Sequence, residues 1–347
     1  MVTGTGSQQH PSIGTMPLLK RWQTAINTCN CPDIHHADAL TRWLVISRAC
    51  VFSMTFTSGL IGVLLAAGIG AFAEDTLFRA FLALLCIVGL VAAHATNNLV
   101  NDWTDVRRGV DTEDYPRAQY STHPVLGGLT TPDALLKAAL ALTLLDGVIM
   151  LYLAAVSGPL VIAFAVAGLL LSLGYTAFLK RWALGELTAL VVWGPLMIGG
   201  TVYAISGALT PAILLLTLPY GLVVASVLIG KHIDKIENDR PVGVYSVPVL
   251  LGQPRALWLN KLTFVLFYAL IAGLVLGGAA GPWLLVTLLA LPRLVTAWRV
   301  YSQPKPAEKP DNWPVWPLWY VGWAMYFNRA AGGLFILGLV LNLVVPV

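Results

Sequence analysis

The sequence predicts an all-α polytopic membrane protein, with about nine transmembrane helices arranged around a central cavity. Composition is the first reason: of 347 residues, 57% are hydrophobic and only 11% are charged, and the mean hydropathy is +0.75. A soluble domain carries about twice that share of charged residues. The second reason is that the apolar residues gather into runs of about 17 to 25, the length that a helix needs to cross a bilayer.

The chain begins with a polar segment, residues 1–40, that contains no apolar run. Its scattered Gly, Ser, Thr, Asn and His residues predict a mobile cytoplasmic N-terminal tail, and the lack of an early apolar stretch argues against a secretory signal peptide. We expect residues 41–347 to form the transmembrane domain.

The tail also holds a metal-like cluster, in which Cys29 and Cys31 are followed by His35 and His36. Two cysteines with one residue between them are too close for a zinc knuckle. The four cysteines of the chain form no even framework, and two of them lie in or near apolar runs. We therefore expect neither a metal site in the tail nor a disulfide.

About nine apolar runs follow, and each is long enough to be a transmembrane helix. They cover residues 44–68, 77–101, 134–155, 159–179, 185–206, 212–232, 258–279, 282–300 and 329–346. Joins without Lys or Arg alternate with joins that carry nearly all of the basic charge. By the positive-inside rule, this alternation predicts a cytoplasmic N-terminus and an external C-terminus, in what we expect to be a bacterial or archaeal cell membrane. The Trp-rich residues 313–326 are typical of an interfacial segment.

An acidic cluster closes the second run, on the side that the basic joins place in the cytoplasm. Asp102 and Asp105 are three residues apart, so on a helix their carboxylates share one face. Gly109 allows a break that would bring Asp111 back towards them. Carboxylates suit Mg²⁺, which completes its shell with water and phosphate oxygens. The pattern therefore favours a diphosphate site over a solvated charge cluster.

A second acidic cluster closes the sixth run. Asp234 and Glu237 again have helical spacing, and Asp239 lies near the helix end because Pro241 and Gly243 follow. Two acidic clusters that face one cavity would hold two or more Mg²⁺ ions. That arrangement matches a diphosphate, because one divalent cation leaves its charge incompletely neutralised.

The two clusters resemble the paired Asp-rich motifs of the UbiA superfamily of intramembrane prenyltransferases. The first cluster, which begins with Asn101, is most similar to the menaquinone-type branch, whose members prenylate 1,4-dihydroxy-2-naphthoate. The second cluster is similar to the family pattern that leads into the seventh helix. Further matching landmarks are Tyr175, Leu179-Lys180-Arg181, Leu184-Gly185-Glu186, Gly243, Ser246 and Gly252. The likeness covers roughly residues 40–347.

The clusters and the resemblance together imply a set of site residues. We expect catalytic roles for Asp102, Asp105, Asp111, Asp234 and Asp239, metal binding by these five and Glu237, and substrate binding by Asn101, Arg108, Tyr175, Lys180, Arg181 and Lys231. Val244 and Tyr245 stand where the family often has a basic residue after Gly243, and the second cluster spaces its aspartates one residue wider than usual. The wider spacing leaves the direction of Asp234 open.

Three more polar residues each allow two interpretations. Asp146, inside the third run, would either bind an acceptor in a cavity or hydrogen-bond between helices. Arg48 would either bind phosphate or extend to the membrane interface. His123, in the loop after the first cluster, would either accept a proton or lie on the surface, and we expect the surface position.

These patterns predict an Mg²⁺-dependent enzyme that transfers a prenyl group from an allylic prenyl diphosphate to a lipophilic aromatic or quinone-precursor acceptor. The enzyme would be surrounded by membrane lipid and would bind no nucleic acid. A terpene cyclase of the same superfamily is one alternative, with Trp103 or Trp193 stabilising a carbocation that is captured intramolecularly. A transporter with a cation path is another, although it would scatter its acids through the spans rather than gather them in two sets.

Overall fold

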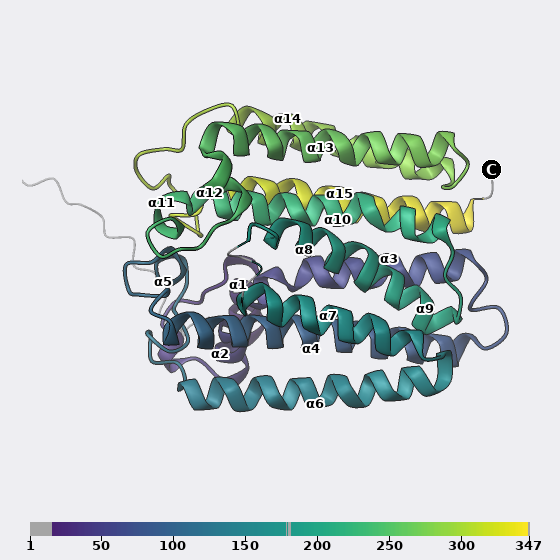
Figure 1. The fold of residues 1–347 in the computed structure, drawn as a ribbon, viewed down its shortest axis with the longest axis horizontal. Helices are drawn as coiled ribbons and strands as arrows, with labels where there is room; N and C mark the ends of the chain where they lie inside the picture. Colours follow the sequence, from purple (N-terminus) through teal and green to yellow (C-terminus); the bar gives the residue numbers. More distant parts are fainter. Residues whose placement is uncertain (1–15, 178, 180–181, 346–347) are drawn as a thin grey trace, which may run out of the picture.

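The computed structural model describes residues 16–177, 179 and 182–345, with the backbone alone at 175–177. Within that part of the chain every regular element is a helix, which confirms the predicted fold class. The long helices lie side by side along the long axis of the molecule (Figure 1). Short helices, among them α5, α11 and α12, gather at one end of this bundle.

The elements follow one another along the chain with short connections. In order they are α1 (Leu18–Thr28), η2 (Ile34–His36), α2 (Ala39–Ile46), η3 (Ala49–Val51), α3 (Phe52–Gly68), α4 (Thr76–Arg107), α5 (Pro116–Tyr120), α6 (Pro132–Ser157), α7 (Leu160–Ala177), α8 (Gly185–Val191), η5 (Val192–Gly199), α9 (Gly200–Ser206), α10 (Pro211–Asp234), α11 (Ile236–Asp239), α12 (Val247–Leu251), α13 (Gln253–Leu276), η6 (Pro282–Ala290), α14 (Leu291–Val300) and α15 (Tyr320–Val344).

Eight helical segments of the described chain are long and apolar enough to cross a membrane. The α7 helix is apolar as well but shorter, so the expected count of about nine agrees with the structure. The last span begins at Tyr320, earlier than the sequence predicts, so α15 takes in part of the Trp-rich segment. In that segment the rings of Trp313, Trp319 and Trp323 pack against one another.

Helix α10 lies at the centre of the bundle and packs against α8, η5, α13 and α15. Small residues matter in such contacts, because lipid tails leave little hydrophobic driving force between helices. A Cβ added to Gly221 of α10 would lie 2.7 Å from the carbonyl oxygen of Leu190 and 3.2 Å from the Cα of Gly194. The close approach of these two glycines holds η5 against α10.

The span from Gly185 to Ser206 is interrupted by η5, which is a π-helix. Pro195 lies inside η5 and has no backbone N–H to donate, so the regular α-helical bonding pattern is broken there. Such π-helical turns are frequent at functional sites. Trp193 lies in this segment and lines the cavity described below.

The segment before residue 40 is more ordered than the sequence predicts. Helix α1 buries Ala25, which packs with Cys31 and Val45 in a small core beside the bundle. Asp38 caps α2 by accepting a hydrogen bond from the backbone N–H of Thr41 at 2.9 Å. A search for long apolar runs misses helices as short as these. Residues 1–15 of the expected tail lie outside the described residues.

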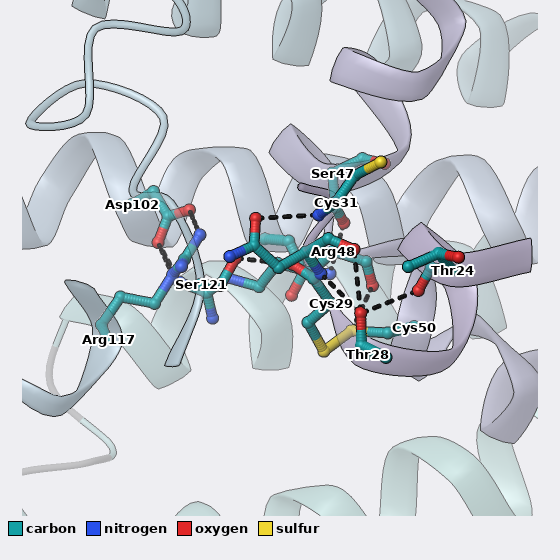
Figure 2. Close-up of a disulfide and its surroundings, with 12 residues drawn as sticks. Thr24, Thr28, Cys29, Cys31, Ser47, Arg48, Cys50, Asp102, Arg117 and Ser121 are labelled. Atoms are coloured by element: carbon teal, nitrogen blue, oxygen red, sulfur yellow. Dashed lines mark hydrogen bonds and ion pairs between the residues drawn. A yellow bond between two sulfur atoms is a disulfide. The ribbon is translucent and has the colours of Figure 1, made fainter. Parts of the chain in front are cut away.

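The expectation of unpaired cysteines is wrong, because Cys29 and Cys50 form a disulfide with 5.0 Å between their Cα atoms. Cys29 follows the last turn of α1 and Cys50 lies in η3, so the bond ties the N-terminal segment to the start of the first span. Figure 2 shows the disulfide beside Arg48, with the hydroxyl of Ser121 donating to the carbonyl of Cys29 at 2.6 Å. Spacing along the sequence missed this pair because tertiary packing brings it together.

Candidate active site

A cavity of about 1220 Å³ lies inside the bundle. Residues of α3, α4, α6, α7, η5, α10 and α15 line it. Many of the lining side chains are apolar, such as Met54, Leu153 and Phe164, and acidic, basic and amide side chains gather where α4 and α10 end. Asp146 of α6, Arg293 of α14 and Arg329 of α15 also line the cavity. A largely apolar hollow with a polar cluster at one end fits a molecule with a charged head and a hydrocarbon chain.

Helix α4 presents one face of polar residues to this cavity. The four residues are His94, Asn98, Asn101 and Asp105, and all of them line the cavity. Their spacings of four, three and four residues keep the side chains on one side of the helix. Asn101 and Asp105 therefore lie where the sequence predicts, on a common face with a polar histidine that the prediction did not include.

The turn after α4 returns Asp111 to the polar end of the cavity. Gly109 adopts a φ of 68°, a left-handed conformation that glycine takes without steric cost. The backbone N–H of Asp111 then donates to the carbonyl oxygen of Asp105 at 3.2 Å. Asp105 and Asp111 share a small polar recess, whose other lining residues are Arg48, Asn101, Tyr115, Arg117, Tyr120, Lys231 and Lys235.

His123 holds the carboxylate of Asp111 in place through a hydrogen bond. Its Nδ1 accepts hydrogen bonds from the backbone N–H groups of Val125 and Leu126, so the proton of the neutral ring lies on Nε2, which donates to Asp111 at 3.1 Å. Burial alone raises the pKa of Asp111, but the hydrogen bond from His123 and the positive charge of Arg48 outweigh it, so the pKa lies below its ordinary value. The expected surface position of His123 is wrong, because the side chain is buried.

Asp102 is fully buried and does not line the cavity. One of its oxygens accepts a hydrogen bond from Arg48, and the other accepts one from Arg117 at 3.0 Å. The ligand atoms of Asp102, Asp111 and His123 lie within 4.8 Å of one another, but each is already engaged in these ion pairs and hydrogen bonds. In this structure Asp102 holds two arginines at the recess instead of facing it.

The two arginines keep hydrogen-bonding capacity for a ligand. Within the described part of the chain, Arg48 Nε and Arg117 Nη1 are buried and have no hydrogen-bond partner. A buried donor without an acceptor is costly, and a phosphate oxygen would remove that cost. Of the two interpretations of Arg48, phosphate binding fits this position better than extension to the membrane interface, because its side chain is buried against Asp102.

Of the three acids in the second cluster, only Asp239 lines the cavity. Lys231, Lys235 and Asp239 line the cavity at successive spacings of four residues. Asp239 is buried, accepts a hydrogen bond from the Tyr115 hydroxyl at 2.5 Å and forms an ion pair with Lys235 at 3.2 Å. These contacts keep its carboxylate at the wall of the cavity.

Asp234 and Glu237 do not join the cavity. The carboxylate of Asp234 accepts hydrogen bonds from the backbone N–H groups of Tyr320 and Val321, at 3.0 and 2.9 Å, and so caps α15. Glu237 is exposed. The physical reason for Asp234 is a tertiary contact, because the first N–H groups of α15 hold its carboxylate, while Lys231, Lys235 and Asp239 line the cavity. The expectation that all six acids face one cavity therefore needs correction at Asp102, Asp234 and Glu237.

Comparison with known proteins supports the same architecture. The model of the UbiA prenyltransferase family matches residues 59–328. The chain belongs to this family. The UbiA chain is 26% identical over 260 residues to a 1,4-dihydroxy-2-naphthoate octaprenyltransferase of Bacillus subtilis (strain 168). The aligned region covers 72% of this chain and 79% of that protein. It is 29% identical over 242 residues to a digeranylgeranylglyceryl phosphate synthase of Natronomonas pharaonis, covering 68% and 82%.

Solved structures share the fold of this UbiA prenyltransferase. The apo structure of a UbiA homolog from Aeropyrum pernix K1 has a TM-score of 0.63 at 19% identity and covers 84% of this chain and 97% of that one. A UbiA homolog from Archaeoglobus fulgidus bound to GPP and Mg²⁺ has a TM-score of 0.57 at 16% identity and covers 85% and 99%. The recognised family and the fold agree with the resemblance seen in the sequence.

The remaining expected site residues of this UbiA enzyme are spread more widely. Lys231 lines the cavity, whereas Arg108 is exposed at the end of α4 and is not among the lining residues. Tyr175 lies in α7, where only the backbone is described, and Lys180 and Arg181 lie outside the described residues. Glu186 is buried and pairs with His232 at 2.6 Å.

Some polar residues of the UbiA site escape prediction from sequence. Arg117, Tyr115, Lys235 and His94 belong to this group. For Tyr115 and Arg117 the sequence does contain a local signal, because Pro116 indicates the start of a short helix directly after the first acidic cluster, and both residues are next to it. The donor set also fits Mg²⁺: Asp105, Asp111 and Asn101 offer hard oxygen ligands beside cations that would hold the substrate phosphates.

Proposed function

We propose that this protein transfers a prenyl group from an allylic prenyl diphosphate to an aromatic or quinone-precursor acceptor inside the membrane, in an Mg²⁺-dependent reaction. The observation that carries the proposal is the cavity itself, which joins a recess of acids and cations to a long apolar hollow. Membership of a prenyltransferase family supplies the reaction class.

The recess supports binding of the diphosphate. Arg48, Arg117, Lys231 and Lys235 place four basic side chains around it. Asp105 and Asp111 would hold Mg²⁺, which as a Lewis acid would offset the negative charge of the leaving diphosphate. This assignment has fewer metal ligands than the sequence predicts, because Asp102, Asp234 and Glu237 do not line the cavity. One oxygen of Asp239 contacts Tyr115 and Lys235, while its other oxygen is buried and has no hydrogen-bond partner among the described residues.

The apolar part of the cavity supports the chemistry that follows. The prenyl chain would lie along the lining of α6, α7 and η5, which excludes water from the allylic carbon. The allylic C–O bond breaks and its electron pair leaves with the diphosphate. A ring carbon of the acceptor forms the new C–C bond, and the ring then loses a proton. A naphthoate-type acceptor is favoured, because relatives of this chain carry the name 1,4-dihydroxy-2-naphthoate octaprenyltransferase.

Cyclisation is the second candidate, and Trp193 favours it because an aromatic ring in the cavity can stabilise a carbocation. Trp103, the other tryptophan considered, lies outside the cavity lining, and the guanidinium of Arg107 lies 4.6 Å from its ring centroid. Transfer and cyclisation differ in whether a second substrate is needed.

We predict that purified protein with Mg²⁺ and a prenyl diphosphate alone releases diphosphate slowly. Addition of a dihydroxynaphthoate-like acceptor should accelerate release by about tenfold or more, because a positioned acceptor lowers the barrier to capture of the cation. The measurement is diphosphate release with mass spectrometry of the lipid product. Rapid release without acceptor, with a cyclic hydrocarbon as product, would show a cyclase instead.

We further propose that both acidic clusters face the cytoplasm, since joins that carry Lys or Arg alternate along the chain with joins that carry neither. Reporter fusions within residues 105–130 and 231–256 should then report a cytoplasmic position, and a fusion at the C-terminus an external one. A cytoplasmic C-terminus would contradict this orientation and the odd number of spans.

A further inference from the structure

His94 lies deep in the cavity, on the same face of α4 as the polar residues of the recess. It precedes Asp105 by 11 residues, so it lies roughly 16 Å further along the helix axis, given a rise of about 1.5 Å per residue. The side chain is only 5% exposed and lines the cavity. It is a polar group in a largely apolar region, and neither the diphosphate nor the metal site uses it.

A chain of hydrogen bonds fixes the proton of this ring. The indole N–H of Trp193, which can only donate, donates to the Thr55 hydroxyl oxygen at 3.1 Å. Thr55 is fully buried, and its oxygen lies 2.7 Å from His94 Nδ1. If Nδ1 carried the proton, the Thr55 hydroxyl would receive two donors, and its own proton would have no acceptor among the described residues. Nδ1 is therefore the acceptor, and Nε2 carries the proton.

Neighbouring groups hold the ring in this orientation. Trp193 packs edge-on against His94 with 5.2 Å between ring centroids, and Phe52 lies 5.3 Å away. The hydroxyl of Ser58 donates to the backbone carbonyl of Trp193 at 2.8 Å and so fixes the π-helical segment that carries the indole. Within the described chain no residue hydrogen-bonds to Nε2 of His94, so this N–H is the donor left for a molecule in the cavity.

We infer that His94 donates a hydrogen bond from Nε2 to an oxygen of the acceptor and thereby places its ring at the allylic carbon; this inference rests on the proposed transferase function. The fixed tautomer defines the chemical class of the ligand. It must present a hydrogen-bond acceptor, such as a carboxylate, carbonyl or phenolate oxygen, because Nε2 can donate but not accept. The prenyl chain has no such group, so His94 selects between acceptors and does not bind the donor substrate.

The depth of His94 agrees with this role. Asn101, at the recess, follows His94 by seven residues, a separation of roughly 10 Å along the helix. A diphosphate held at the recess would extend its allylic carbon into the cavity that His94 also lines. An aromatic ring in attacking position would then lie between the recess and His94, with a polar substituent directed towards Nε2.

Four variants of the full-length enzyme test the inference, with the KM of each substrate measured separately. His94→Asn should raise the KM for a dihydroxynaphthoate-like acceptor by about tenfold or more, the loss expected for one hydrogen bond to an anionic oxygen. The KM for prenyl diphosphate should stay within about twofold. His94→Gln should retain most of the acceptor affinity, because its amide nitrogen reaches the position of Nε2. Thr55→Val should give an intermediate increase, since the tautomer is no longer fixed.

Thr217→Val is the matched control. Thr217 is buried in α10 and does not line the cavity, and its hydroxyl donates to the carbonyl of Leu214 in its own helix at 2.7 Å, so its removal should leave both KM values unchanged. An unchanged acceptor KM in His94→Asn, or an equal rise in both KM values without rescue by His94→Gln, would overturn the inference while leaving prenyl transfer intact. Failure of the unsubstituted enzyme to prenylate any oxygen-bearing aromatic would overturn the proposed function and this inference together.

Discussion

Asp105→Asn is expected to reduce the rate of prenyl transfer by roughly a hundredfold to a thousandfold, which is the range seen when one preorganised charge-stabilising group is removed from an active site. Asp105 lines both the cavity and its polar recess, where the diphosphate and Mg²⁺ would meet. An amide keeps the size of the side chain but removes the negative charge that binds a hard cation. The measurement is the initial rate of product formation, together with the Mg²⁺ concentration that gives half of the maximal rate.

Glu237→Gln supplies the matched control for this experiment. It makes the same change from carboxylate to amide within the second acidic cluster, but Glu237 is exposed and does not line the cavity. Its rate and its Mg²⁺ requirement should therefore equal those of the unsubstituted protein. Near-normal turnover in Asp105→Asn would reject the assigned metal site, and an equal loss in Glu237→Gln would show that the acids act through their overall charge.

The part of this site that could be predicted from sequence depends on local geometry. Helical periodicity places Asn101 and Asp105 on one face whatever surrounds the helix, and Gly109 permits the turn that returns Asp111. The fold class follows from composition and from the length of the apolar runs in the same local way. These features need no knowledge of tertiary contacts.

The part that could not be predicted depends on residues far apart in the chain. The sequence predicts Asp234 in the metal site, but the direction of its side chain depends on the start of α15, whose N–H groups it caps from 86 and 87 residues away. The sequence predicts Asp102 there as well, but Asp102 pairs with Arg48 and Arg117 through contacts that no spacing rule reveals. The Cys29–Cys50 disulfide depends in the same way on how α1 packs beside the first span.

Asp102→Asn is expected to act mainly on stability, which separates it from Asp105→Asn. Asp102 is fully buried between the guanidinium groups of Arg48 and Arg117. Removal of one partner from a buried ion pair costs about 3–5 kcal/mol, because the remaining charge is left without compensation in a poorly hydrated site. The variant should therefore melt at a clearly lower temperature in detergent and express less folded protein, whereas Glu237→Gln, at an exposed position, should melt close to the unsubstituted protein.

A second substitution distinguishes charge imbalance from loss of a metal ligand. If Asp102 stabilises the fold by neutralising the arginines, Arg117→Gln added to Asp102→Asn should restore part of the lost melting temperature, because one uncompensated cation is removed. The two single variants and the double variant then form a cycle in which the effects are not additive. If Asp102 were instead a metal ligand, Asp102→Asn would keep a normal melting temperature, would need more Mg²⁺ for activity and would gain nothing from Arg117→Gln. That result would return Asp102 to the metal site and reject the structural role assigned to it here.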